Sequence, residues 1–459
     1  MQVLTETRRE PARTTLQIAP VVGKDILELL TSAMYVDPLC IYREYVQNAA
    51  DAIDEARDAR LFGSQKIPRI NVKLDLSARR IIIRDNGIGI AANVFSRRLT
   101  ALGASKKRGS KARGFRGVGR LAGLAYSQQL IFRSKAKGAP ITREIQWDCR
   151  KLKTLLRDHS FKGDLHDVMR EVVAFEDSPG NSGEHFFEVE LRGVNRIRND
   201  VLLNESVVRD YLSQIAPLPF AKDFSFGDMI TEKLSAYGIG DTHNVFLNES
   251  DVPLTRPFNN LFQARKQQTD RFDGVEFLEV PGLSGDLDAV GWILHHGYHG
   301  ALPDRSPIRG LRLRSGNMQI GNANLFDVVF PEPRFNGWAV GEIHLISNKL
   351  VPNGRRDDLE QSTHQQNLIT HVMPYAKKVA KLARQKSIER NQIARPNGAE
   401  TQPAFRLAAL LTRRQKAWLR KQPKAAAAAY ERLLSLLSSH SRPRDITPLI
   451  KQVLDDLCK

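Results

Sequence analysis

The chain has 459 residues, of which 41% are hydrophobic and 26% are charged, and its formal net charge is +18. This length is enough for about two to four domains with substantial cores. No apolar run reaches the roughly eighteen residues of a membrane span, and the first residues lack an apolar signal region, so we expect a cytoplasmic protein. The three cysteines, Cys40, Cys149 and Cys458, have neither metal-site nor disulfide spacing and are expected to be free thiols.

The first strong pattern is a helix over residues 41–56. An N-terminal arm (1–14), a short strand (16–19) and a helix (23–34) are expected before it. Within residues 41–56 the polar residues Glu44, Asn48 and Asp51 are four and three positions apart, which places them on one helix face. The remaining positions are mostly apolar or small, so this polar line is expected to be buried and to need partners. On its own it would also fit an internal hydrogen-bond ladder.

A hairpin is expected next. Residues 69–76 alternate strictly between apolar and polar, and residues 77–80 turn the chain back into a β-branched strand that ends at Asp85. The strand is followed by a D-x-G-x-G turn containing Gly87 and Gly89, a pattern that allows close approach to the backbone. A D-N-G sequence alone usually marks only a turn. Joined to the E-x-x-x-N-x-x-D helix, it is far more specific.

Residues 102–124 form a glycine-rich cationic stretch. Between residues 96 and 120 there are nine Lys or Arg and no acid, and the glycines are Gly103, Gly109, Gly114, Gly117, Gly119 and Gly123. Free backbone N–H groups leading into an apolar helix (121–125) favour a phosphate cradle. Lys106, in the segment G-A-S-K, either touches phosphate or is solvated.

Two other motifs do not fit this stretch. Gly109 and Gly114 have the spacing of a Walker loop, but Phe115 and Arg116 follow where Lys and Ser or Thr are required. The run from Gly117 to Ala122 imitates a dinucleotide fingerprint, but no strand leads directly into it.

Together, in this order and spacing, the three stretches resemble the Bergerat-fold (GHKL) ATPases, which include type II topoisomerases, MutL proteins, histidine kinases and the ninety-kilodalton heat-shock chaperones. The resemblance implies an α+β protein whose residues 1–195 form an α/β-sandwich ATP-binding domain that uses ATP and Mg²⁺. Asp85 would read adenine, and Gly87 and Gly89 would let the backbone approach the base. Gly114, Gly117 and Gly119 would belong to a lid that covers the phosphates.

The same resemblance assigns roles on the helix. Glu44 would be the general base for water, and Asn48 would ligate Mg²⁺ through its amide oxygen. Asp51 would anchor the nucleotide through water or orient its neighbours. Further strands are expected at 143–147 and 186–191. Relatives carry Gly-Thr before the second of these strands, whereas here Gly183 is followed by Glu184 with Ser182 adjacent, so the second adenine contact stays open.

A second unit is expected over residues 196–363. It contains a predicted helix (200–215), strands (245–247 and 277–280), a strand pair (311–320) and a loop after residue 339. The opening segment (16–57) and this loop are most similar to the heat-shock chaperones, whose middle domain sends an arginine to the γ-phosphate. The counterpart is Arg356, between Asn353 and Asp357, with Arg355 as the open alternative. Without the family resemblance, the sequence of this loop also fits a surface turn with two solvated arginines.

Residues 364–459 are expected to be a basic helical tail. Helices are predicted at 365–392, 405–421, 424–439 and 446–457, with a linker at 396–403. From residue 361 onward there are nineteen Lys or Arg and six Asp or Glu, a net +13 of the total +18. Such a tail is usually a solvated surface, although its charge would also suit nucleic acid, an acidic protein or a membrane surface. It contains no recognisable nucleic-acid-binding motif.

Two functions compete at this point. The first is a slow, chaperone-like ATPase that acts on protein clients. It is favoured by the opening segment (16–57) and by the loop that contains Arg356 (353–357, the arginine loop). The alternative is an ATP-gated nucleic-acid clamp of the MutL, topoisomerase or MORC type, which the basic tail favours. A histidine kinase is disfavoured because no phospho-acceptor helix precedes the ATPase unit. Whether the chain forms a homodimer is left open.

Overall fold

The computed structural model of the chain describes residues 23–24, 27, 37–63, 67–101, 119–181, 183–264 and 268–393, with side chains to residue 390. The expected arm, first strand, most of the first helix and the helices after residue 405 lie outside these ranges. The same holds for Lys106, Gly114, Gly117, Ser182 and Cys458. The described cysteines, Cys40 and Cys149, are buried free thiols, as predicted.

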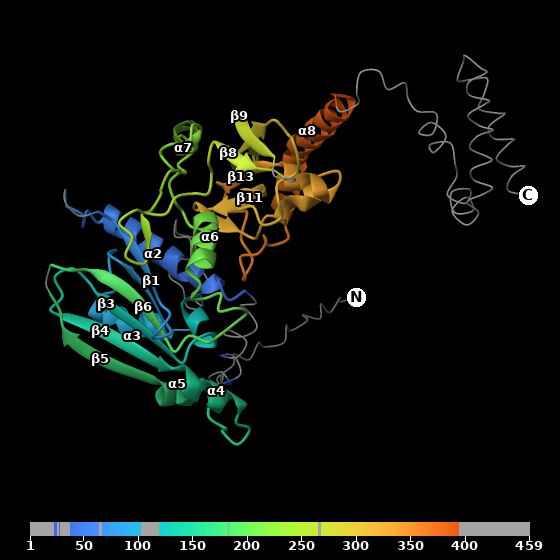
Figure 1. Cartoon of the computed structure of the whole chain (residues 1–459). Helices are drawn as coiled ribbons and strands as arrows, with labels where there is room; N and C mark the ends of the chain where they lie inside the picture. The colour runs from blue at the N-terminus through green and yellow to red at the C-terminus, as the bar shows by residue number, and fades with distance from the viewer. Residues whose placement is uncertain are drawn as a thin grey trace, which may run out of the picture. The chain divides into compact units, whose positions relative to one another are not determined.

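The chain divides into two compact units, residues 1–386 and 387–459. Nearly all of the described residues belong to the first unit, which contains two β-sheets (Figure 1). Among the described helices, none combines the length and the apolar character needed to cross a bilayer.

The first sheet has seven strands in the order β5-β4-β3-β6-β2-β1-β7. Its strands are β1 (Ile70–Asp75), β2 (Arg80–Asp85), β3 (Gln129–Lys135), β4 (Ile141–Asp148), β5 (Val173–Pro179), β6 (Phe186–Arg192) and β7 (Val245–Leu247). Its helical elements are α2 (Cys40–Asp58), α3 (Ala92–Thr100), η2 (Gly119–Ala125), α4 (Cys149–Arg157) and α5 (Leu165–Val172). Strand β7 comes from far along the chain and pairs in parallel with β1.

Alternation along the strands gives this sheet two different faces. Ile81, Ile83 and Leu191 are buried in one core with Val46 and Ile53 of α2. The opposite face carries ion pairs, in which the Arg133 guanidinium lies 2.6 Å from Glu144, 2.9 Å from Glu188 and 2.6 Å from Glu190. One face covered by helices and one lined by charged groups make a two-layer α/β arrangement, which is consistent with the fold of a GHKL ATPase.

Most of the predicted elements are present. The helix over 41–56 is α2, the hairpin is β1–β2, and the strands at 143–147 and 186–191 are β4 and β6. The prediction of a helix from residue 200 is wrong at its start, because α6 spans Glu205–Ile215. Arg198, Asn199 and Asp200 have φ values of 41°, 58° and 61°, which a right-handed helix cannot contain, and Asn204 caps the helix.

The second sheet has six strands in the order β12-β11-β13-β10-β9-β8. They are β8 (Leu261–Gln263), β9 (Thr269–Pro281), β10 (Leu287–His296), β11 (Gly310–Ser315), β12 (Met318–Ile320) and β13 (Val340–Leu345), accompanied by helices α7 (Gly227–Ser235), η4 (Leu325–Val329), η5 (Pro333–Trp338) and α8 (Thr363–Ile393). The predicted strand pair at 311–320 is β11–β12, and the helix expected at 365–392 is α8.

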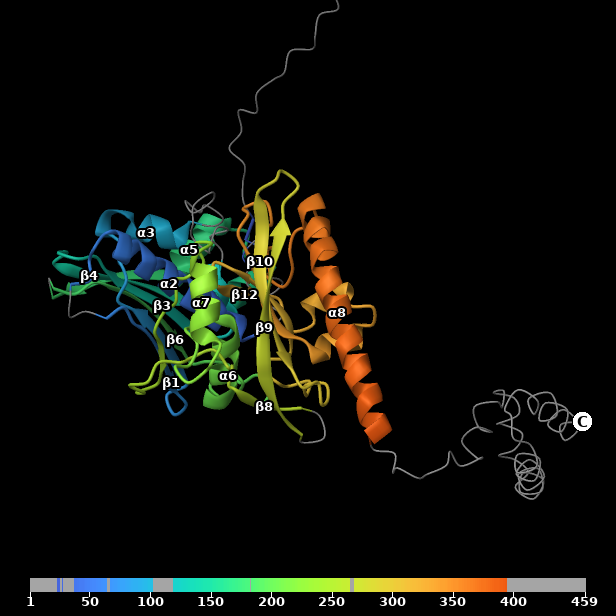
Figure 2. The same cartoon turned by 90° about the horizontal axis from the view of Figure 1, so that it is seen from above.

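Strand β10 explains why helices lie on both faces of this sheet. Ala289 and Ile293 are in one core with an α8 stripe that repeats at helical spacing, Leu368, Val372, Ala376, Val379, Ala380 and Ala383. Trp292 and Leu294 point the other way, into a core with Ile230 of α7. Figure 2 shows α8 running along one side of β9 and β10 with α7 on the other side. A strand buried on both faces is expected to have an unbroken apolar run, and β10 has one from Ala289 to Leu294.

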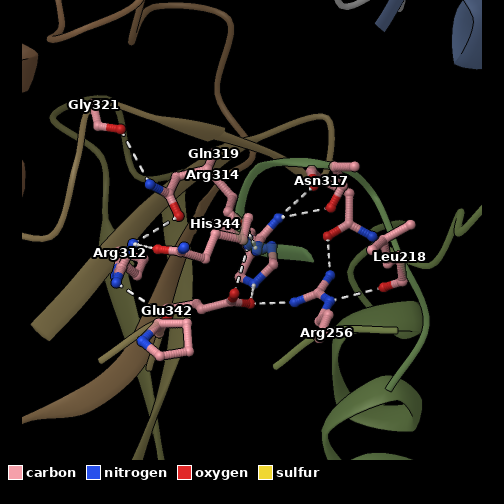
Figure 3. A network of polar contacts seen from close by, with 12 residues as sticks. Leu218, Arg256, Arg312, Arg314, Asn317, Gln319, Gly321, Glu342 and His344 are labelled. Atoms are coloured by element: carbon pink, nitrogen blue, oxygen red, sulfur yellow. Dashed lines mark hydrogen bonds and ion pairs between the residues drawn. The ribbon is translucent and has the colours of Figure 1, made fainter. Parts of the chain in front are cut away.

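A buried polar cluster lies at the centre of the second sheet (Figure 3). Glu342 on β13 pairs with Arg256 and with Arg314 on β11, whose Nε lies 2.5 Å from the carboxylate. All three side chains are at most 3% exposed. Burial would raise the pKa of Glu342, but Arg256 and Arg314 outweigh this effect and hold its pKa below the ordinary value. The glutamate is therefore ionised in the core.

His344 completes this cluster. Its Nε2 lies 3.2 Å from Glu342, and Nδ1 is buried without a hydrogen-bond partner in the described part of the chain. Burial lowers the pKa of His344 to about 4, against the partly opposing effect of Glu342. The imidazole is therefore neutral at pH 7.

This shift predicts a pH dependence of stability. The pKa of His344 in the folded protein lies below its ordinary value, so between about pH 6.5 and pH 4 the unfolded chain binds a proton that the folded chain does not. The free energy of unfolding should fall by up to about 3 kcal/mol as the pH drops through this window. Urea titrations across the window should show a smaller fall for His344→Gln. If the free energy of unfolding fell equally with pH in the wild type and in His344→Gln, the pH dependence could not be assigned to His344.

Candidate functional site

The polar face of α2 is buried as expected. Glu44 is 9% exposed, Asp51 is 3% exposed and Asn48 is half-buried. A fourth polar residue, Gln47, lies on the same face and is 1% exposed. Its Oε1 is buried and has no hydrogen-bond partner among the described residues. Sequence reasoning missed Gln47, although its position three residues after Glu44 was a usable signal.

Glu44 meets two guanidinium groups. Its Oε1 lies 3.7 Å from Nε of Arg43 and 3.9 Å from Nε of Arg356, and the side chains of Glu44 and Arg356 are each 12% exposed. Arg43 also donates from Nη2 to the Arg355 carbonyl at 2.8 Å. The structure thus brings together two residues that sequence reasoning placed in different domains. Arg355, the open alternative, has an exposed side chain.

The D-x-G-x-G turn docks on the other end of the same helix face. Asp85 is 2% exposed and accepts a hydrogen bond from the Gly87 N–H at 2.8 Å. The Ile88 N–H donates to the Ala52 carbonyl of α2 at 3.0 Å. A Cβ at Gly87 would lie 2.6 Å from the Ala52 carbonyl carbon, so only glycine permits this contact.

Gly89 has a related constraint. Its φ is +70°, and a Cβ there would lie 2.2 Å from the Lys135 carbonyl oxygen of β3. The close approaches that these two glycines make in the structure are therefore to the protein's own backbone, which fixes Asp85 between β6 and α2. Their predicted contact with a nucleobase stays a prediction.

His185 is the residue near Asp85 that sequence reasoning did not assign. It is 4% exposed, and its Nδ1 lies 2.7 Å from the Gly87 carbonyl oxygen. Because a carbonyl only accepts, Nδ1 carries the proton in this contact. Strand alternation puts residue 185 on the same face of the sheet as Phe187, which pairs with Asp85. A buried histidine thus lies next to the position where relatives carry threonine.

Gly119, the first described residue of the glycine-rich stretch, lies against Glu44. A Cβ at Gly119 would lie 1.9 Å from Oε2 of that carboxylate. Tyr45 ties the following η2 turn to α2, because its hydroxyl donates to the Arg120 carbonyl at 3.0 Å and accepts from the Gly123 N–H at 2.9 Å. Burial raises the pKa of Tyr45 above its ordinary value, so the hydroxyl keeps the proton it donates.

These residues fit a nucleotide with Mg²⁺. The α2 face supplies carboxylate and amide oxygens, which are the ligands that Mg²⁺ prefers, and one of them, Gln47 Oε1, is buried without a partner in the described ranges. Arg356 supplies positive charge at one end of the face, while Asp85 lies at the other. Residues 44 and 51 are about 10 Å apart along a helix, so the face is long enough to hold an elongated ligand.

A comparison with known families agrees with this geometry. Residues 42–160 match the family described as histidine kinase-, DNA gyrase B- and HSP90-like ATPases. The chain contains a GHKL-type ATPase domain. The polar residues of α2, the D-x-G-x-G turn and Gly119 lie within the matched residues, whereas Arg356 and His185 lie outside them.

Curated relatives of the GHKL-type ATPase domain are chaperones. Chaperone protein HtpG of Polaromonas naphthalenivorans is 27% identical over 139 residues, 27% of this chain and 22% of the relative. The proteins of the same name from Burkholderia ambifaria and Photorhabdus laumondii are 28% identical over 142 residues, again 27% of this chain and 22% of each relative. The matched segment thus spans about a fifth of the length of these relatives.

The contact between Gly119 and Glu44 allows the carboxylate to be displaced by a substitution that leaves Glu44 itself in place. In Gly119→Ala the new methyl group should push the flexible end of Glu44 aside, so ATP turnover should fall about tenfold or more while the fold persists. Gly63→Ala is the matched control, since a Cβ at Gly63 would meet nothing within 4 Å. Equal turnover rates for the two variants would show that the position of the Glu44 carboxylate does not matter.

Proposed function

We propose that this chain binds ATP with Mg²⁺, hydrolyses it slowly, and uses the cycle as a chaperone-like protein acting on protein clients. The observation that carries the proposal is the 3.9 Å approach of Arg356 to Glu44. A carboxylate that activates water and an arginine that stabilises phosphoryl charge are two of the parts that ATP hydrolysis requires. The division into domains at 1–195, 196–363 and 364–459 belongs to the same proposal, although β7, from the second of these segments, pairs with β1 in the first sheet.

Each residue has a role in this proposal. Glu44 takes a proton from the attacking water, and Arg356 stabilises negative charge on the transferred phosphoryl group. Asn48, with the orphaned oxygen of Gln47 beside it, would hold Mg²⁺, which when bound neutralises phosphate charge. Asp51 orients its neighbours or anchors the nucleotide, and Asp85 accepts the amino group of adenine. Gly114, Gly117, Gly119 and Lys106 would close over the phosphates.

Support for the chaperone-like assignment comes from two sources. The relatives bear the name chaperone protein HtpG, and the arginine loop has a counterpart in heat-shock chaperones. Whether the basic tail contacts nucleic acid is tested by the response of turnover to DNA.

The first test separates nucleotide binding from turnover. Asp85→Asn should abolish ATP binding, because the carboxylate that would select adenine loses its charge and its acceptor strength. Glu44→Ala should bind ATP normally and lose turnover, since only the general base is removed. Calorimetric binding and steady-state turnover measure the two effects. Micromolar binding by Asp85→Asn would remove the adenine assignment, and normal turnover by Glu44→Ala would assign another base.

Turnover should also be measured with and without duplex and single-stranded DNA at two salt concentrations. A Glu44-dependent rate that DNA leaves unchanged supports the chaperone-like function. Strong stimulation that salt suppresses would instead support the nucleic-acid clamp, because phosphate contacts weaken steeply with salt.

The two arginines of the loop provide a matched pair. Arg356→Ala should reduce turnover by about 10²-fold or more with little loss of ATP affinity, because a charge that acts in the transition state is removed. Arg355→Ala should change turnover about twofold or less, since its side chain is exposed. If Arg355→Ala proves the more damaging variant, the assignment of the two arginines is reversed.

A further inference from the structure

The loop that carries Arg356 is a folded unit in its own right. The Asn353 N–H donates to the Asp358 carbonyl at 2.9 Å, and the Arg356 N–H donates to the Asn353 carbonyl at 3.1 Å. The side chain of Asn353 donates to the Asp357 carboxylate at 2.6 Å and accepts from the Asp357 N–H at 3.2 Å. These bonds join residues 353–358 into one structural unit. Because they are all internal to the loop, its position depends on its contacts with other segments.

One such contact is made by the residue at the end of strand β12. The Gly321 N–H donates to the Arg356 carbonyl at 2.9 Å. Gly321 has a φ of +64°, and a Cβ there would lie 2.7 Å from the Asp357 carbonyl oxygen. Any side chain at this position would press on the backbone of the loop, so β12 can touch the loop this closely only through glycine.

Gln319 connects this contact to Arg312 in the network of Figure 3. Arg312 in turn shares Gln214 with Arg314 of the buried cluster, since Arg312 donates to the Gln214 side-chain oxygen at 3.2 Å and Arg314 donates to the Gln214 carbonyl at 2.6 Å. Its Nε2 donates to the Gly321 carbonyl at 3.1 Å, and its Oε1 accepts from Arg312 at 3.2 Å. Arg312 is 5% exposed and is fixed by the carbonyls of Arg309, at 2.9 Å, and Pro307, at 3.1 Å. A rigid buried guanidinium therefore determines where the amide of Gln319, and with it the end of β12, is held.

The cluster also binds the C-terminal end of α6 and the residue that follows it. Arg314 donates to the Gln214 carbonyl at 2.6 Å and to the Ala216 carbonyl at 3.3 Å, while pairing with Glu342. Helix α6 packs against α2 and β12. The contacts thus form a closed path from α2 through α6, the cluster and β12 to the arginine loop, and back to α2 where Arg356 meets Glu44. In some proteins buried ionic groups contribute a specific geometry rather than stability.

We infer that Gly321 and Gln319 are positioning residues for Arg356, and that the buried arginine–glutamate cluster sets where this arginine stands relative to Glu44. The inference rests on the proposed ATP hydrolysis but assigns a role that the hydrolysis itself does not require. It explains why the short strand β12 is followed by Gly321, a glycine with positive φ that contacts the arginine loop.

The decisive variant is Gly321→Ala, with Gly285→Ala as its control. Gly285 has a φ of +89° in the same sheet's β9–β10 turn, and a Cβ there would meet nothing within 4 Å. Both variants carry the strain of alanine at positive φ, but only Gly321→Ala presses on the arginine loop. We expect Gly321→Ala to lower kcat about tenfold or more with affinity for a non-hydrolysable ATP analogue within about twofold, and Gly285→Ala to change neither.

A double-variant comparison separates positioning from general damage. In an Arg356→Ala background, Gly321→Ala should reduce kcat by less than about twofold further, because the side chain it displaces is already gone. Gln319→Leu, which keeps the volume but removes the amide, should behave like Gly321→Ala and provides a second route if the alanine variant folds poorly. A full additional loss in the Arg356→Ala background would overturn the inference, as would equal rates for the two glycine variants.

A readout that does not need hydrolysis keeps the two proposals apart. Hydrogen exchange of the amides of residues 353–358 should accelerate in Gly321→Ala and Gln319→Leu, and stay unchanged in Gly285→Ala. If the wild type hydrolyses no ATP, the proposed function fails, and this exchange pattern still decides the positioning. Unchanged exchange in Gly321→Ala and Gln319→Leu would overturn it.

Discussion

Burial of polar groups along one face of α2 is the constraint on which the rest of this structure depends. A carboxylate, two amides and a second carboxylate are removed from bulk water, and each would be costly without partners. The fold supplies those partners from distant parts of the chain. Arg43 and the arginine loop meet Glu44 at one end of the helix, and the D-x-G-x-G turn bonds to the Ala52 carbonyl further along it. Among the described residues, the Gln47 side-chain oxygen is buried on this face without a hydrogen-bond partner, which marks where an external ligand would complete the set.

The parts of the fold with a strong period could be predicted from sequence. Helix α2, hairpin β1–β2 and α8 follow directly from apolar spacing, and the spacing of Glu44, Asn48 and Asp51 predicted their common face. Helix α6 shows where such reasoning fails. Its apolar pattern begins early, but the left-handed backbone of residues 198–200 delays the helix to residue 205. Backbone conformations of this kind leave little trace in a single sequence, because here they fall on Arg, Asn and Asp rather than Gly.

Within the candidate site, local patterns and tertiary contacts contribute differently. Arg356 could be singled out only through a family resemblance, since no period links a loop at residue 356 to a helix at residue 44. Tyr45 was counted among the apolar residues of α2, yet its hydroxyl holds the η2 turn. His185 carries no local signal for a role, although it contacts the Gly87 carbonyl. In each case the side chain's chemistry was visible, but its partner lies far away in the sequence.

Strand β7 has a practical consequence for dissecting this protein. It is only three residues long and belongs to the later part of the chain, yet it covers the outer edge of β1. A fragment ending near residue 195 would leave unpaired the N–H and C=O groups of β1 that face β7, and such an open strand edge invites edge-to-edge association. It would also lose Leu212, Val245 and Leu254 from the first core. A soluble nucleotide-binding fragment should therefore extend past residue 254.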